Sequence, residues 1–384
     1  MFGFMLQSLR NLCAYLCLLP TLLVGIATSC SQAPRNVGAG RADTLHYAQW
    51  LAIERYEGFT LVTVRNPWQP EAALQRYVLV PKSDSLPTAL PEATLVRTPV
   101  ERAVMHNAVH ARLAYDLGVG RRVAGLCDVD YVVGEQLRSA LSEGRLHDAG
   151  SSVNFNMERC VALRSEAVFT SPLQDISTDV LRAVGIPVVE CADYMEPHPL
   201  GRAEWMKFFG LLFDCSQVAD SLYAAVEAEY QALAAQAVGR AERPRLMLDL
   251  PQGGTWYVPG GRSYLGILLR DAGADYAFAA DAHAGSIALG RERGLLEARG
   301  ADVWLIRQAT VANHTYSSLK REDPLFASFR PWKERRIFVC NTLRSDFFER
   351  IPFQPHVLLR ELVALLRKDG GVPAADAYFQ PLEE

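Results

Sequence analysis

The sequence lacks an excess of charge of one sign. It has 384 residues, with 39 Lys and Arg against 43 Asp and Glu, and a formal net charge of −4. Proteins that bind nucleic acid usually carry a basic surface, so nucleic acid is excluded as a partner. A content of 49% hydrophobic and 21% charged residues is ordinary for a globular protein and too apolar for a disordered one.

The sequence also lacks the short motifs of many enzyme and cofactor sites. It has no HExxH zinc motif, no GxxxxGKS/T phosphate loop, and no GxGxxG that opens a helix after a strand. Gly261–Gly266 (GRSYLG) comes near the GxSxG elbow of serine hydrolases, but its last glycine is one residue late. A membrane-tethered hydrolase with Ser263 as nucleophile therefore remains as an alternative of a different class, and no other catalytic residue is predicted.

The eight cysteines lack the CxxC spacing of metal sites. Cys13 and Cys17 lie in an apolar leader, and Cys30 lies directly after it. The folded part of the chain then has five cysteines, an odd number. We interpret the remaining five as mainly buried, small apolar residues. One disulfide among them stays open, and no zinc site is predicted; they are Cys127, Cys160, Cys191, Cys215 and Cys340.

The first thirty residues have the pattern of an export signal. Residues 12–26 are apolar, contain Pro20, and are shorter than the roughly 20 residues of a spanning helix, so residues 1–29 are predicted to be a secretory signal peptide. The following Ala27–Cys30 (ATSC) resembles a bacterial lipobox in the relaxed form of Bacteroidetes-type lipoproteins, which makes Cys30 the predicted lipidation site. A signal peptide with an incidental cysteine is the alternative. Residues 30–45, rich in small, polar, Gly and Pro residues, are expected to form a flexible tether.

Strands and helices alternate along the rest of the chain. A β-hairpin is predicted from residues 58–68 and 76–82. Short apolar strands are then expected at 103–105, 122–126, 167–169 and 186–189, and again at 246–248, 303–306 and 336–339. Helices are expected at 109–117, 157–163, 180–184, 263–272 and 295–298. This alternation predicts an α/β fold with mainly parallel sheets in two lobes, residues 46–213 and 241–384.

A single long helix is predicted between the lobes. Residues 216–240 contain no proline and keep apolar residues at helical spacing, at Val218, Leu222, Val226 and Tyr230. At 1.5 Å per residue this helix is about 35 Å long. We assign residues 214–240 to the connection and expect a ligand cleft between the two lobes, where ligands of such folds usually lie.

Several segments resemble a known family. Asn156–Leu163 (NMERCVAL) is similar to the family's NLERIVAL motif, and Gly185–Val188 matches its GIPV strand. Tyr194–Gly210 and Gly253–Tyr264 resemble a Bacteroidetes-type branch. From about Thr98 onward, the chain resembles the class III substrate-binding lipoproteins of ABC importers for iron-siderophores, haem and cobalamin.

This resemblance implies two Rossmann-like lobes joined by one helix and a protein that is not an enzyme. It implies a monomer without a resident cofactor, anchored by lipid in the periplasm of a Gram-negative bacterium. The expected partners are an ABC permease with its ATPase and a metal-chelate or tetrapyrrole ligand. One glutamate per lobe is implied to dock on the permease: Glu158 in the N-terminal lobe and Glu292 in the C-terminal lobe. Exposed carboxylates contribute little as internal salt bridges but can orient a partner.

The ligand is expected to contact loops that follow the strands of both lobes. Aromatic walls with a few cations suit a large, flat or catecholate-bearing ligand that is often anionic. The candidate ligand-binding residues are His106, His110, Tyr131, Ser171, Trp256, Tyr257, Arg262, Tyr264, Phe347 and Arg350.

Two alternatives concern the histidines. His106 and His110 are four residues apart, so in a helix they would share a face, as metal ligands do. The chain would then be a zinc or manganese receptor of similar fold. A histidine or tyrosine could instead contact the iron of a bound haem axially. The sequence does not decide between siderophore, haem, cobalamin and bare metal.

Overall fold

The computed structural model describes residues 39–153, 156–172, 185–239, 242–367 and 373–384. The predicted signal peptide, the lipidation site Cys30, most of the tether and the helix predicted at 180–184 lie outside these ranges. Within the described part of the chain, no helix is both long and apolar enough to span a bilayer.

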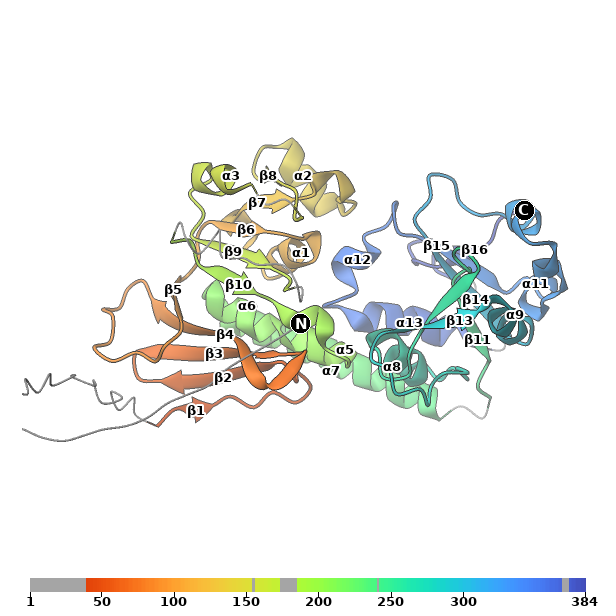
Figure 1. The fold of residues 1–384 in the computed structure, drawn as a ribbon, viewed down its shortest axis with the longest axis horizontal. Helices are drawn as coiled ribbons and strands as arrows, with labels where there is room; N and C mark the ends of the chain where they lie inside the picture. Colours follow the sequence, from red (N-terminus) through yellow and green to blue (C-terminus); the bar gives the residue numbers. More distant parts are fainter. Residues whose placement is uncertain (1–38, 154–155, 173–184, 240–241, 368–372) are drawn as a thin grey trace, which may run out of the picture. The chain divides into compact units, whose positions relative to one another are not determined.

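The N-terminal lobe contains a parallel five-stranded sheet. Its order is β10 (Val188–Glu190), β9 (Ala167–Thr170), β6 (Ala103–Met105), β7 (Val123–Cys127) and β8 (His147–Gly150), with every neighbouring pair parallel. β6, β7, β9 and β10 are buried throughout because helices cover both faces. The helices are α1 (Ala108–Asp116), α2 (Glu135–Ser142) and α3 (Met157–Ala162), and α3 lies beside β8 (Figure 1). The strands predicted here are confirmed.

A second sheet precedes the parallel one, and the sequence did not predict it as a separate layer. Its order is β1 (Arg41–Ala42), β2 (Leu51–Tyr56), β3 (Phe59–Asn66), β4 (Gln69–Pro81) and β5 (Thr94–Thr98). The predicted hairpin is its β3–β4 pair, and only β4 and β5 run parallel. One face buries Leu51, Ile53, Val62 and Val64 in the main core, because alternate residues of a strand point to the same side.

The C-terminal lobe has a smaller sheet of order β11 (Leu246–Leu248), β14 (Val303–Gln308), β15 (Ile337–Asn341) and β16 (Gln380–Pro381). The first three strands are parallel, as predicted, and β16 is antiparallel. A hairpin of β12 (Thr255–Pro259) and β13 (Ser286–Gly290) lies beside this sheet. The helices are α8 (Tyr264–Asp271), α9 (Arg291–Arg299), α10 (Tyr316–Glu322), α11 (Arg330–Lys333), α12 (Phe347–Arg350) and α13 (Pro355–Leu365).

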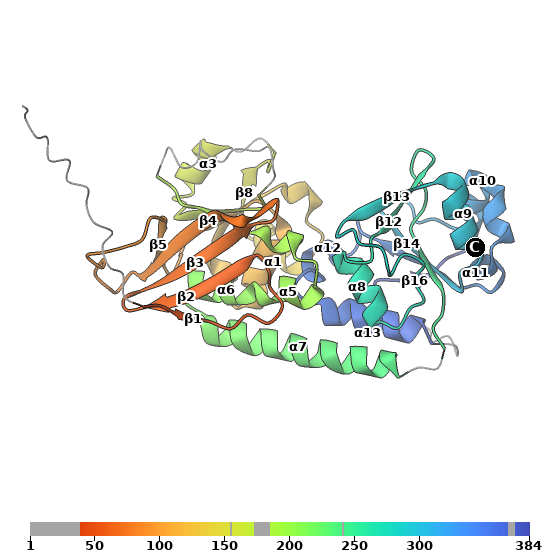
Figure 2. The same cartoon turned by 60° about the horizontal axis from the view of Figure 1, so that its bottom comes forward.

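The predicted long helix is present as α7, Ser216–Val238. It packs against α5 (Pro199–Glu204), α6 (Met206–Leu212) and α13, and Figure 2 shows α13 running beside it. Val226 and Tyr230 are buried as the pattern indicated, whereas Val218 is exposed. Short 3-10 turns complete the fold: η1 (Gly120–Arg122), η2 (Val129–Tyr131), η3 (Ala192–Met195) and η4 (Pro324–Ser328).

One hydrophobic core crosses from lobe to lobe. It contains Met105 and Phe169 of the N-terminal sheet together with Leu248 and Phe338 of the C-terminal sheet. Phe209 of α6 is fully buried, and its ring lies 5.4 Å from that of His110 and 6.1 Å from that of Phe353. Since residues of both lobes pack in a single core, the lobes are joined by far more than the connecting helix.

The five cysteines of the described part are free thiols. Four are buried and Cys215 is half-buried, which confirms their interpretation as small apolar residues. Burial raises the pKa of the Cys160 thiol to about 11 and that of Cys340 to about 12. These thiols are therefore protonated and unreactive near neutral pH.

Candidate ligand-binding site

A pocket of about 400 Å³ lies at one edge of the N-terminal parallel sheet. All five strands run parallel, so their carboxyl ends meet at this edge. The residues that follow β6, β7, β8 and β9 line the cavity, which we call the N-lobe pocket: His106, Asn107, Ala108, Cys127, Asp128, Tyr131, Ser152, Val153 and Ser171. The position of this pocket follows directly from the strand order.

The N-lobe pocket has an uncharged imidazole and an aromatic rim. Burial lowers the pKa of His106 to about 4, although Asp128 opposes this shift, so the ring is neutral at pH 7. Asp128 has left-handed backbone geometry (φ 53°) and its carboxylate accepts a hydrogen bond from the Ser152 hydroxyl. Asn107 Nδ2 donates to Ser171 Oγ over 3.0 Å. The Tyr131 side chain is 75% exposed at the rim.

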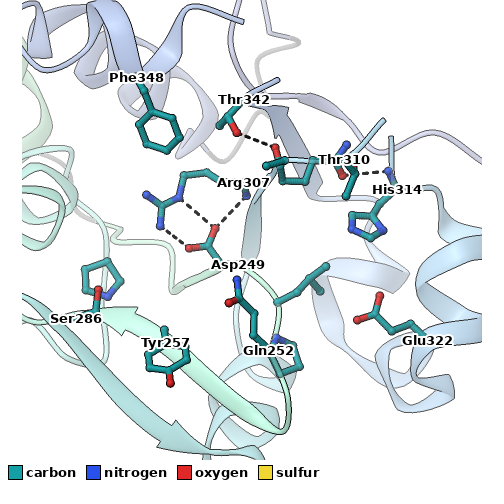
Figure 3. Close-up of a pocket in the computed structure, with 15 residues that line it drawn as sticks. Asp249, Gln252, Tyr257, Ser286, Arg307, Thr310, His314, Glu322, Thr342 and Phe348 are labelled. Atoms are coloured by element: carbon teal, nitrogen blue, oxygen red, sulfur yellow. Dashed lines mark hydrogen bonds and ion pairs between the residues drawn. The ribbon is translucent and has the colours of Figure 1, made fainter. Parts of the chain in front are cut away.

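A second pocket of about 600 Å³ lies at the corresponding edge of the C-terminal sheet. Asp249 follows β11, Arg307 and Thr310 lie at the end of β14, and Thr342 follows β15. Tyr257 of β12 and Phe348 of α12 add aromatic rings that are 50% and 55% exposed. We call this cavity the C-lobe pocket (Figure 3).

An ion pair forms the centre of the C-lobe pocket. Asp249 Oδ1 accepts the Arg307 backbone N–H at 2.9 Å and the Nε–H at 3.1 Å, and Oδ2 contacts the guanidinium. Figure 3 shows Tyr257 and Phe348 on opposite sides of this pair. Gln308 is held in place as well, because its amide oxygen accepts the His314 N–H and its amide nitrogen donates to Asn313.

A buried carboxylate makes a contact between the two lobes. Glu349 of α12 is 6% exposed. Its Oε1 accepts the backbone N–H groups of Val133 at 2.7 Å and Gly134 at 3.0 Å, immediately before α2. Tyr131 is two residues before Val133, and Phe348 is adjacent to Glu349. The Glu349 contact therefore brings the segment that carries Tyr131, at the N-lobe pocket, close to the segment that carries Phe348, at the C-lobe pocket.

Further polar bonds reinforce the lobe contact. Arg112 of α1 bonds Asp346 at 2.7 Å, and Gln354 donates to Asp116 of α1 at 2.9 Å. A Cβ atom at position 134 would overlap the Glu349 carboxylate, so a larger residue than Gly134 would displace that side chain. Carboxylates are stabilised at helix N-termini, where backbone N–H groups are unpaired, so Glu349 and the start of α2 complement each other.

The structure brings four of the predicted ligand residues to the pockets. His106, Tyr131 and Ser171 line the N-lobe pocket, and Tyr257 lines the C-lobe pocket. Their contact with a ligand stays a prediction.

The other six residues lie elsewhere. Trp256 is fully buried and its Nε1–H donates to the Leu248 carbonyl, and Phe347 is buried in the main core. The Tyr264 hydroxyl donates to the Ile351 carbonyl, and Arg350 Nε donates to Gln354. Arg262 is exposed, and neither arginine lines either pocket.

His110 is the sixth of these residues, and its placement removes the basis of the zinc or manganese alternative. It is 1% exposed, and its Nε2 lies 2.8 Å from Asp193 Oδ1. His106 precedes α1 rather than lying within it, so the two histidines do not share a helix face. Throughout the described residues, no group of three or more His, Cys, Asp or Glu side chains is placed to hold a metal ion.

Ser263 serves as a helix cap in this structure. Its Oγ accepts the Gly266 N–H at the start of α8 and donates to the Gly260 carbonyl. The side chain is buried and both of its hydrogen bonds are local. This geometry gives the hydrolase alternative no support, since the hydroxyl is not presented to a pocket.

Sequence reasoning missed Asp249, Arg307, Phe348 and Glu349. Asp249 could have been found, because it directly follows the predicted strand 246–248 and such positions line ligand sites. Phe348 is adjacent to the predicted Phe347, but nothing in a four-residue helix indicates which of two phenylalanines points outward. The partners of Glu349 lie more than two hundred residues away, so no local pattern reports them.

Both predicted docking glutamates are exposed. Glu158 lies in the first turn of α3 and Glu292 in the first turn of α9, so each lobe presents one of them. Docking itself stays a prediction.

Two pockets at the carboxyl ends of parallel strands, one in each of two α/β lobes, are typical of a two-lobe ligand-binding protein. Residues 104–342 match the sequence model of a family described as periplasmic binding protein. This match spans more than half of the chain, and the protein therefore belongs to the periplasmic binding protein family. Its members bind ligands without transforming them, so the prediction of a non-enzymatic protein is confirmed.

Known proteins support this assignment. The chain is similar to the uncharacterized lipoprotein MJ0878 of Methanocaldococcus jannaschii, with 24% identity over 78% of this chain and 74% of the relative. A periplasmic haem-binding protein of Pseudomonas aeruginosa superposes with a TM-score of 0.56 at 17% identity, covering 74% of this chain and 98% of that one. The molybdate-bound MolA of Haemophilus influenzae gives 0.56 at 18% identity, over 71% of this chain and 87% of that one. These structures show the same two-lobe fold.

The lobe contact yields a stability prediction. Replacing Glu349 by Gln removes the negative charge that accepts hydrogen bonds from the backbone N–H groups of Val133 and Gly134. The amide of Gln offers these two donors a single, uncharged oxygen. Because hydrogen bonds to a charged group contribute about 1.5–3 kcal/mol, the free energy of unfolding should fall by roughly 1–3 kcal/mol. Urea unfolding at pH 7 measures this change.

Glu143→Gln is the matched control, since Glu143 is exposed just after the other end of α2 and pairs locally with Arg145. It should leave the unfolding midpoint unchanged. Equal midpoints for Glu349→Gln and Glu143→Gln would contradict the stabilising role of the lobe contact.

Proposed function

We propose that this protein is the substrate-binding component of an ABC importer that captures an iron chelate, haem or a corrinoid and delivers it to a membrane permease. The observation that carries the proposal is that each lobe has a pocket with exposed aromatic rings at the carboxyl ends of its parallel strands. Tyr131, Tyr257 and Phe348 are each at least half exposed. Exposed apolar groups gathered at a concave site mark a binding surface for a ligand with large apolar faces.

The kinds of ligand bound by similar structures support the proposal. One neighbour is a haem-binding protein of Pseudomonas aeruginosa. Another, from Staphylococcus epidermidis, is described as a possible iron-binding protein; it has a TM-score of 0.54 at 17% identity over 69% of this chain and 98% of that one. The fold is reused for different ligands, so pocket residues and not the fold determine which one is bound.

The location is proposed from the leader and from the archaeal relative. We propose lipidation at Cys30, with the residues between Cys30 and β1 as a tether that holds a monomeric receptor at the outer side of a membrane; the predicted tether of residues 30–45 is too long, because Arg41 and Ala42 pair with β2. The lipoprotein name of the relative in Methanocaldococcus jannaschii supports an anchor. The Gram-negative periplasm stays a prediction, because that relative comes from an archaeon.

The permease would be recognised through both lobes. Glu158 and Glu292 are exposed carboxylates on different lobes, so a permease with two basic sites could contact both. Charged groups at the rim of an interface orient partners and raise the rate of association.

A titration tests the proposed ligands. Haem, cobalamin and ferric siderophores are added to the purified protein, and absorbance and tryptophan fluorescence are recorded. At least one should bind, and Phe348→Ala and Tyr131→Ala should each weaken that binding about tenfold, since loss of a buried aromatic contact of about 1.4 kcal/mol has this effect. Leu86→Ala, at an exposed apolar residue outside both pockets, is the control and should not change the affinity. A response to zinc or manganese alone would contradict the proposal.

Docking is tested by reversing one charge. Glu158→Arg should reduce uptake of the ligand by cells while leaving its affinity for the purified protein unchanged, because Glu158 lies outside both pockets. Glu71→Arg makes the same charge change on an exposed residue of β4 and should leave uptake intact. If Glu158→Arg lowers ligand affinity as well, the residue belongs to the ligand site or to the fold.

A further inference from the structure

The described residues that line the two pockets carry few positive charges. In the C-lobe pocket the charged side chains are Asp249, Glu322 and Arg307, and in the N-lobe pocket Asp128 is the charged one. Among these described lining residues, Arg307 is the one cation, with histidines counted as neutral. The wall thus has three carboxylates against one guanidinium. His106 adds no charge at pH 7, because burial lowers its pKa to about 4.

The single cation is held by its own carboxylate. Both the Arg307 backbone N–H and its side-chain Nε–H donate to Asp249 Oδ1, at 2.9 and 3.1 Å. Asp249 is in turn fixed, because its backbone is left-handed (φ 57°) and its carbonyl accepts the Trp304 Nε1–H at 2.9 Å. Arg307 is therefore neutralised within the wall and not presented to a ligand.

The cations expected beside the ligand lie elsewhere. Arg262 and Arg350 led the sequence analysis to favour an anionic ligand, but neither is among the described residues that line the N-lobe pocket or the C-lobe pocket. An anion placed here would lose hydration beside the surplus carboxylates Glu322 and Asp128, with no unpaired cation among the described lining residues to compensate. Aromatic faces, in contrast, accept apolar surface and attract positive charge.

We infer that the ligand is an uncharged or cationic metal chelate or macrocycle, of the ferric trihydroxamate or corrinoid type, and not an anion. This inference rests on the proposed function and narrows it. It separates the protein from its structural neighbour MolA, which was solved with the anion molybdate. The aromatic residues Tyr131, Tyr257 and Phe348 would contact the ligand faces, and the Asp249–Arg307 pair would exclude anionic competitors.

Affinities for ligands of different charge test the inference. The purified full-length protein is titrated, at one ionic strength, with an uncharged ferric trihydroxamate and with cyanocobalamin. A ferric tris-catecholate, haem and molybdate are the anionic probes. One of the uncharged ligands should bind at least about tenfold more tightly than every anion, as expected when like charges face each other.

The outcomes separate the two proposals. Tighter binding of haem or the tris-catecholate would overturn the inference and leave the proposed function standing, whereas tightest binding of molybdate would overturn both. If none of the five probes bound, both would be overturned. Comparing the affinities for the ferric trihydroxamate and for cyanocobalamin also decides which of these two uncharged ligand types the protein prefers.

Asp249→Asn tests the role of the ion pair directly. Asparagine tolerates left-handed backbone geometry and keeps an oxygen for the Arg307 N–H, but it leaves the guanidinium without a carboxylate. The ratio of tris-catecholate affinity to trihydroxamate affinity should rise at least about tenfold. Glu322→Gln, which removes an exposed carboxylate without touching the pair, should raise the ratio less.

Glu334→Gln is the control, because it makes the same charge change in the surface pair with Arg330. It should leave the ratio as in the parent protein, and circular dichroism and thermal unfolding show that each variant is folded. An unchanged ratio in both folded pocket variants would overturn the inference.

Discussion

A buried carboxylate crosses between the two lobes near the residues that line both pockets. Glu349 reaches from α12 to the N–H groups of Val133 and Gly134, and this contact sets Phe348 beside the segment that carries Tyr131. Removing a carboxylate from water is unfavourable unless several hydrogen bonds compensate, and the free N–H groups before a helix provide them. The geometry of the ligand site therefore depends on a contact that does not itself belong to either pocket wall.

The contact does not act alone. α7, α13 and a core shared by both sheets join the lobes on one side, while the carboxyl ends of the strands carry the pockets. The joined region is rich in packed aromatic rings such as Phe209 and Phe353, whereas the pocket rims expose theirs. The packed aromatic rings therefore lie where the lobes are joined, and the exposed rings lie at the pockets.

Sequence patterns predicted the features that arise from local chemistry. Buried strands such as 303–306 and the long helix from Ser216 have clear periodicity, and the family resemblance of Asn156–Leu163 is confirmed by the match to the family. The site was predicted less well. Trp256 and Phe347 are of residue types that often line pockets, but here they pack in the core. His110 is hydrogen-bonded to the buried carboxylate of Asp193. Which way these side chains point depends on partners far along the chain, and single-sequence patterns carry no information about them.

A direct test of the joined-lobe account is the distance between the lobes with and without ligand. Spin labels at Val161 of α3 and Leu296 of α9, both exposed, report this distance by pulsed electron resonance. The account predicts that saturating ligand shifts the mean distance by no more than about 2 Å, as in preorganised binding proteins. A shift several times larger, as in hinge closure around a ligand, would contradict it, because the shared core and the Glu349 contact could not both persist through such a motion.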